Sequence, residues 1–217
     1  MKAFWVLLKK EWVLEWRRGY AFGGILLYLF STVFIIYATF RTVDILTWTA
    51  LFWIIAVFVS VSAIGKSFVQ EGEGRYLYLY TLADPQIVLA AKVLYNFALL
   101  FGLNLLIWGI FSFAVGSPVQ LKGQFLLVLL LGSFALSAIL TFISAIAAKA
   151  GKSGTLMAVL SFPLLIPVLL TGLRITQNTA AIQGMSLDTS GDFLIMFAII
   201  LLSMGMGFIL FPQVWKD

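Results

Sequence analysis

Six long apolar stretches, none of which contains a charged residue, constrain what this chain can fold into. They are residues 21–40, 45–64, 93–115, 125–147, 155–173 and 193–211. Each is long enough to cross a hydrocarbon core about 30 Å thick, which takes a helix of about 20 residues. All 14 basic and 9 acidic side chains fall in the connections and tails, because a charge at mid-bilayer costs about 2.5–3.5 kcal/mol. The sequence therefore predicts an all-α integral membrane protein with six transmembrane helices, and a single transmembrane domain over residues 1–217.

The basic residues predict how this domain lies in the membrane. If the N-terminus is cytoplasmic, only three of the 14 Lys and Arg residues, Arg41, Lys122 and Arg174, fall outside. This positive-inside bias predicts a multi-pass protein with both termini in the cytoplasm. The same bias explains the sequence pI near 9.5 through topology and anionic membrane lipid, so nucleic-acid binding is not expected.

The chain has neither cysteine nor histidine. Disulfides, thiolate chemistry, zinc sites and imidazole acid–base catalysis are thereby excluded within it. The acidic residues are confined to the connections, so the chain is not expected to be an enzyme or to bind a cofactor directly. A haem ligand would have to be Met or Tyr, the less common axial choices.

Residues 2–18 come before the first span and are not apolar enough to cross a membrane. Tryptophans recur there at helical spacing on one side, while Glu11, Glu15 and Arg18 line another. This pattern predicts an amphipathic interfacial helix on the cytoplasmic surface, in contact with membrane lipid. Two roles stay open for it: a simple anchor, or a part that transmits movement to the first span.

The longest cytoplasmic connection, residues 65–86, has an unusual composition, "GKSFVQEGEGRYLYLYTLADPQ". It mixes charged residues with phenylalanine and three tyrosines, which favours a segment that contacts a partner. The alternative is an aromatic belt at the membrane surface. Pro85 suits the first turn of the following helix, and Lys92 is expected to extend its ammonium group to the lipid headgroups.

Polar residues inside the spans are few. Asn96 and Asn104 lie in the third span, where a buried amide either bridges helices or faces a transport pathway. The fourth span carries a row of small hydroxylated residues, which favours close helix packing over substrate contact: Ser133, Ser137, Thr141 and Ser144.

Three prolines shape the last two spans. Pro163 and Pro167 are four residues apart, so they share a face of the fifth span and are expected to kink it. The kink is either a static shape or a hinge. Pro212 is expected to end the sixth helix.

The turn after the fourth span, "AAKAGKSG" over residues 147–154, contains the Gly-Lys-Ser of a phosphate-binding loop. Such a loop needs a glycine five residues before that tripeptide and a preceding β-strand. Ile146 occupies the glycine position, and an apolar stretch far too long for a strand comes before it. This chain is therefore not expected to bind ATP itself.

Three functional classes remain to be weighed: a secondary transporter, an integral-membrane enzyme, and a membrane subunit driven by a separate motor. Ion-coupled transporters usually place an ionisable residue inside the bundle, and no span here has one. Because the specialised sequence lies in the cytoplasmic connections, the third class fits best. A stand-alone secondary transporter of a small or lipophilic substrate is the alternative.

The segment "SFVQEGEGRYLYLYTLADPQIVLAAKVLYNFALLFGLNLL" resembles the second-to-third-span region of heme exporter protein B, the CcmB family. The corresponding positions are Phe68, Glu71, Gly74, Leu77, Leu82, Pro85, and Leu89-Ala-Ala-Lys92. A second block, "AAKAGKSGTLMAVLSFPLLIPVLL", resembles the basic-glycine turn and Pro-x-x-x-Pro helix of that family, through Lys149, Lys152, Gly154, Pro163 and Pro167. The resemblance covers nearly the whole chain.

The resemblance implies the ABC-2 type exporter fold and a place in the bacterial inner membrane. It implies a complex for cytochrome c biogenesis with a CcmA-like ATPase, with CcmC-like and CcmD-like membrane proteins, and with a second copy of the chain. ATP would act through the ATPase subunit, either to export haem or to release a haem-loaded chaperone. The third span of that family often carries His and Trp where this chain has Tyr95 and Asn96, so a role for that histidine does not carry over.

On this hypothesis, residues 65–86 form a coupling segment that rests in a cleft of the ATPase, and the 147–154 turn makes a second, weaker contact. The expected ATPase-contact residues are Phe68, Glu71, Gly74, Arg75, Lys149 and Lys152.

Overall fold

In the computed structural model, the chain forms a bundle of α-helices. The structure describes residues 2–17, 20–40, 42–65, 84–150, 153–179 and 189–216, and this part contains helices without strands. The helices are α1 (Lys2–Arg17), α2 (Tyr20–Thr39), α3 (Ile45–Ile64), α5 (Pro85–Val115), α6 (Lys122–Lys149), α7 (Ser153–Thr179) and α8 (Ser190–Lys216).

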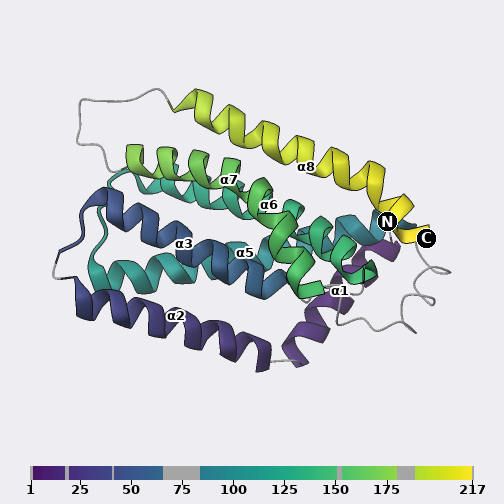
Figure 1. Ribbon diagram of the computed structural model, residues 1–217, viewed down its shortest axis with the longest axis horizontal. Helices are drawn as coiled ribbons and strands as arrows, with labels where there is room; N and C mark the ends of the chain where they lie inside the picture. The colour runs from purple at the N-terminus through teal and green to yellow at the C-terminus, as the bar shows by residue number, and fades with distance from the viewer. Residues whose placement is uncertain are drawn as a thin grey trace.

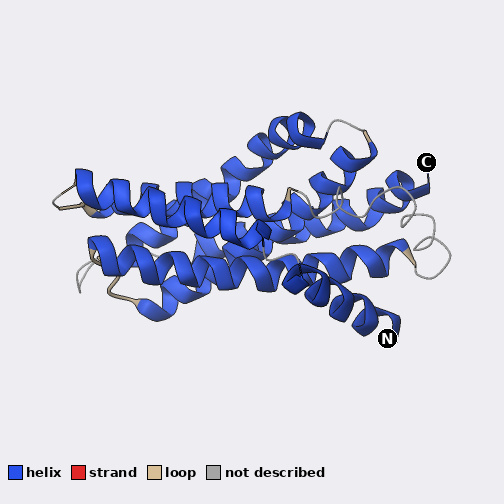
Figure 2. Ribbon diagram, turned by 90° about the horizontal axis from the view of Figure 1, so that it is seen from below, coloured by secondary structure: helices blue, strands red, loops and turns tan. Residues whose placement is uncertain are grey.

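The six helices after α1 run lengthwise beside one another, whereas α1 lies at an angle across one end of the bundle (Figures 1 and 2). Both termini lie at that end. Helix α6 is central, since it packs against α3, α5, α7 and α8. Helices α2 and α8 lie on opposite flanks in Figure 1, and the large apolar side chains they expose suit a lipid-facing surface.

Five helices, α3, α5, α6, α7 and α8, are long and apolar enough to cross a membrane. The apolar part of α2, Gly23–Thr39, is shorter. The predicted all-α, membrane-embedded class is thus confirmed, with five candidate spans and not six by this measure. The assignment of one end of the bundle to the cytoplasm stays a prediction.

The helices extend beyond the predicted spans. Helix α5 begins at Pro85, eight residues before the predicted span, because Asp84 caps it by accepting a hydrogen bond from the Gln86 backbone N–H at 3.1 Å. Proline is well suited to this first helical position, where its missing N–H would have no helical partner. The prediction for Pro85 is confirmed.

Two predictions, one for Pro212 and one for Lys92, are wrong. Pro212 does not end the last helix, since α8 continues to Lys216. The neighbouring Phe211 is fully buried in a cluster with residues of α5 and α6, and these contacts hold the helix in place. Lys92 does not extend to the lipid headgroups, because it is buried beneath α1 and pairs with Glu11.

Helix α7 contains Pro163 and Pro167 as predicted. It bends along its length in Figure 1. Both prolines lie on the exposed side of the helix, while Ser161, Leu165 and Val168 face the bundle.

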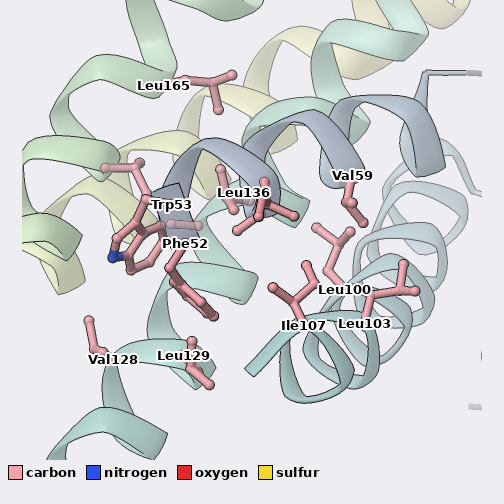
Figure 3. Close-up of a cluster of buried hydrophobic side chains, with 14 of the residues drawn as sticks. Phe52, Trp53, Val59, Leu100, Leu103, Ile107, Val128, Leu129, Leu136 and Leu165 are labelled. Atoms are coloured by element: carbon pink, nitrogen blue, oxygen red, sulfur yellow. The ribbon is translucent and has the colours of Figure 1, made fainter. Parts of the chain in front are cut away.

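The core is centred on Phe52 and Trp53 of α3, which lie among Leu136, Val128 and Leu129 of α6 (Figure 3). The Trp53 indole fills a slot between Gly132 of α6 and Gly172 of α7. A Cβ placed on either glycine would lie 2.8 Å or 2.5 Å from the ring. The slot therefore requires glycine at both positions, and it locks three helices together.

Candidate functional site

The seam between α5 and α6 holds the two asparagines of the predicted third span. Asn96 donates a hydrogen bond from Nδ2 to Thr141 Oγ1 at 2.8 Å, and Asn104 donates from Nδ2 to Ser133 Oγ at 2.9 Å. Ser137 Oγ donates to the Val93 carbonyl at 2.7 Å. All these side chains are buried, so the geometry matches the interhelix alternative for the asparagines and the packing role for the hydroxylated row.

Four polar atoms close to this seam are buried and have no hydrogen-bond partner within the described part of the chain. Ser144 Oγ is on α6; the other three, Asn104 Oδ1, Trp108 Nε1 and Ser112 Oγ, are on α5. An unpaired buried polar atom costs about 1–3 kcal/mol, so these atoms offset part of the stability that the hydrogen bonds of the seam contribute.

The N-terminal end of α5 carries the charged part of the candidate site. Lys92 Nζ lies 3.2 Å from Glu11 Oε1 of α1, and Lys92 is 1% exposed. Glu11 also lies 3.6 Å from the Nζ of Lys10. One turn along α5, the rings of Tyr95 and Trp12 make an edge-to-face contact with their centroids 6.2 Å apart.

Helix α1 is therefore oriented with Glu11 toward the protein and Trp5 away from it, while Trp12 lies at the edge, partly exposed and in contact with Tyr95. Trp5 is 66% and Trp12 56% exposed, whereas Leu7 packs against a buried cluster formed by α5, α6 and α8. An amphipathic helix with Trp on its outer face is suited to the membrane interface. The predicted helix over residues 2–18 exists as α1, and its contact with lipid stays a prediction.

The predicted ATPase-contact residues are only partly visible. Phe68, Glu71, Gly74, Arg75 and Lys152 lie outside the described residues. Lys149 is exposed in the last turn of α6. Helix α3 ends and α5 begins at the end of the bundle where both termini and α1 lie (Figure 1), which is also the end that holds the charged site.

The pairing of Lys92 with Glu11 was missed by sequence reasoning. The signal available was weak: a lysine just before a predicted span and a glutamate on the polar side of a predicted interfacial helix. Nothing in the spacing of two residues 81 positions apart shows that they meet. The Trp53 slot was missed for the same reason, since it joins three helices distant in sequence.

Comparison with known proteins gives one family. A search of curated proteins found no match. The family model described as "CcmB protein" matches residues 2–212, which is nearly the whole chain. The chain therefore belongs to the CcmB family, the membrane component of the haem exporter in the cytochrome c maturation system.

Proposed function

We propose that this chain is the non-catalytic transmembrane subunit of an ABC transporter complex that couples ATP hydrolysis by a separate subunit to haem export, or to the release of a haem-loaded chaperone. The observation that carries this proposal is the family match over residues 2–212. The partners we propose are a CcmA-like ATPase, CcmC-like and CcmD-like membrane proteins, and a second copy of the chain. Six spans, an ABC-2 fold, a bacterial inner-membrane location and cytoplasmic termini belong to the same proposal.

The charge distribution supports a subunit driven from outside the bundle. Among the described helices, the one buried charged residue is Lys92, and it pairs with an acid of the same chain. The other Asp, Glu, Lys and Arg residues of the five candidate spans are close to a helix end: they are Lys122, Lys149, Arg174 and Asp192. None lies in the middle of a span, where it could carry a coupling ion. Energy for movement is therefore expected to enter at the end of the bundle that holds α1 and the start of α5.

The connection over residues 65–86 is the proposed contact with the ATPase. Glu71 and Arg75 would make polar contacts in a cleft of that subunit, and Phe68 would add an apolar one. Lys149 and Lys152 would touch it more weakly from the neighbouring turn. Closure of two ATPase subunits around ATP would then move two copies of this bundle against each other.

The test is to replace Glu71 and Arg75 together by alanine and to measure copurification of the ATPase and its ATP turnover. We expect both to fall, because charged groups that become buried and paired at an interface cost about 2–5 kcal/mol of binding when truncated. Lys122→Ala is the matched control, because Lys122 is exposed at the opposite end of the bundle. Undiminished binding with normal turnover would contradict the assigned contact. Transport by the purified chain without any ATPase would contradict the proposed class.

A further inference from the structure

Lys92 is a buried cation whose partner comes from a different helix. It is the one charged residue among the buried side chains of the described ranges. The apolar residues Val88, Leu89 and Val93 of the same helix belong to the buried cluster around it. Glu11 of α1 supplies the acceptor at 3.2 Å, and Glu11 is itself largely covered. The charge of Lys92 is thus neutralised by α1.

The contact between the two helices extends over about two turns. Leu7, one turn before Glu11, packs against the cluster that contains Val88 and Leu89. Trp12, next to Glu11, makes its ring contact with Tyr95, one turn after Lys92. An ion pair flanked by an apolar contact on one side and a ring contact on the other fixes both the position and the rotation of α1.

Separating α1 from α5 would take the Glu11 carboxylate away from the buried ammonium group of Lys92. Removing one partner of a buried ion pair is strongly unfavourable, because the remaining charge is neither hydrated nor paired. We propose that α1 and the first turns of α5 move as one rigid unit, with Glu11 and Lys92 as its positioning residues. Helix α1 then moves together with α5 and does not move independently at the membrane surface.

The place of this unit in the chain gives it a role in coupling. Helix α5 begins directly after the proposed ATPase contact, and α1 leads through residues 18–19 into α2. A displacement at the start of α5 is therefore passed to α1 and from there to α2. This step rests on the proposed function, which supplies the source of the displacement. The rigid attachment of α1 to α5 does not depend on the proposed function.

The first experiment reverses each charge in the full chain, in complex with the ATPase. Glu11→Lys and Lys92→Glu each place like charges together. The quantity measured is the stimulation of ATP turnover, which is the increase that this chain causes over the ATPase alone. We expect each variant to lower that stimulation about tenfold while the ATPase still copurifies. The double variant Glu11→Lys with Lys92→Glu restores the opposite pair and should recover most of the stimulation. Lys122→Glu changes the net charge equally at the far end of the bundle and should have no effect.

The second experiment measures the attachment directly and needs no ATPase. The chain has no cysteine, so spin labels can be placed cleanly through Lys9→Cys on α1 and Gly109→Cys on α5, both exposed positions. We expect a single narrow distance distribution in the parent and in the charge-swapped variant, and a broad one in each single reversal. Glu11→Gln, which keeps an acceptor but loses the charge, should broaden it less and serves if the reversals do not fold.

The outcomes separate the two proposals. Full stimulation and narrow distributions in the reversed variants would overturn the rigid unit, and so would a swapped variant that recovers neither. If the ATPase fails to bind the unaltered chain, the proposed function fails, and the spin-label measurement still decides whether α1 is attached to α5.

Discussion

At the scale of single residues, glycine decides where Trp53 can lie. The indole fits against α6 and α7 only because Gly132 and Gly172 have no side chain. Its Nε1 donates a hydrogen bond to Thr176 Oγ1 at 3.0 Å, and that hydroxyl in turn donates to the Gly172 carbonyl at 2.7 Å. Small residues at helix contacts are a general device in membranes, because they let backbones and large side chains approach closely.

Gly172→Ala is expected to destabilise the protein, because the new Cβ would lie 2.5 Å from the Trp53 ring and the ring also lies against Gly132. Overpacking of this kind typically costs about 1–3 kcal/mol. Gly109→Ala is the control, since its added Cβ meets nothing within 4 Å. The midpoint of thermal unfolding in detergent should fall for Gly172→Ala alone. Adding Trp53→Leu to Gly172→Ala should relieve the clash. Equal unfolding midpoints for Gly172→Ala and Gly109→Ala would contradict the claim that the Trp53 ring requires glycine at position 172.

Asp44 is the residue through which pH should act on α3. It precedes the helix, and its carboxylate accepts hydrogen bonds from the backbone N–H groups of Leu46 and Thr47 at 3.2 and 3.4 Å. The hydrogen bond from the Thr47 side chain, assisted by these backbone N–H groups, lowers the pKa of Asp44 below its ordinary value of 3.8. Because the folded state favours the charged carboxylate, its contribution to stability is present above that ordinary value and is lost as the pH falls through the lower folded pKa.

Asp44→Asn should keep the cap, because the asparagine side chain also accepts from the helix N-terminus, but should remove this part of the acid dependence. Thermal unfolding midpoints at neutral and acidic pH would show a smaller acid-induced fall for Asp44→Asn than for the parent. Asp44→Ala removes the cap and should be less stable at both pH values. An unchanged acid dependence in Asp44→Asn would contradict the assignment of the shift to this cap.

At the scale of helices, the existence of each element could be predicted from the sequence, whereas its ends and neighbours could not. The absence of charge over about 20 residues is a local property and marks a membrane helix directly. The ends depend on caps and on packing: Asp84 and Pro85 start α5 early, and the burial of Phe211 carries α8 past Pro212. A proline near the end of a helix removes one hydrogen bond, and the contacts of Phe211 offset that loss.

The candidate site was less predictable than the fold for the same reason. The row of hydroxylated residues on α6 indicates a packed face, and the structure places α5 against it. Lys92 was expected to reach the headgroups because a lysine near a span end usually does. What overrides that tendency is Glu11, whose position over α5 follows from how α1 packs and not from any pattern in its own sequence.

At the scale of the whole molecule, one end of the bundle differs from the other. Both termini, helix α1 with its ion pair to α5, and the start of α5 gather at one end. At the other end, the backbone N–H groups of Gln120 and Leu121 donate to the Thr179 carbonyl of α7, and Trp48 Nε1 donates to the Gly116 carbonyl at 2.9 Å. The loop between α5 and α6 thus ties α3 and α7 to it at the second end, and a moving partner is expected to act on the first.

The natural absence of cysteine makes the orientation and the number of spans testable in one experiment. Single cysteines at the exposed positions Thr42, Gln120, Lys9 and Gln213 would be treated, in intact cells, with a thiol reagent that does not cross membranes. Gln120→Cys should react, whereas Lys9→Cys and Gln213→Cys should react only after the membrane is opened, because the positive-inside bias places both termini in the cytoplasm.

The Thr42→Cys variant tests whether α2 crosses the membrane. The 20 residues of α2 make a helix about 30 Å long, which is enough to span, although the apolar part of α2 is shorter. If α2 crosses, Thr42→Cys reacts from outside like Gln120→Cys. If α2 does not cross, the five remaining spans place Thr42→Cys and Gln120→Cys inside and Gln213→Cys outside. Labelling of Gln213→Cys in intact cells, with Thr42→Cys and Gln120→Cys labelled only in opened cells, would therefore contradict six spans and leave α2 at the cytoplasmic surface.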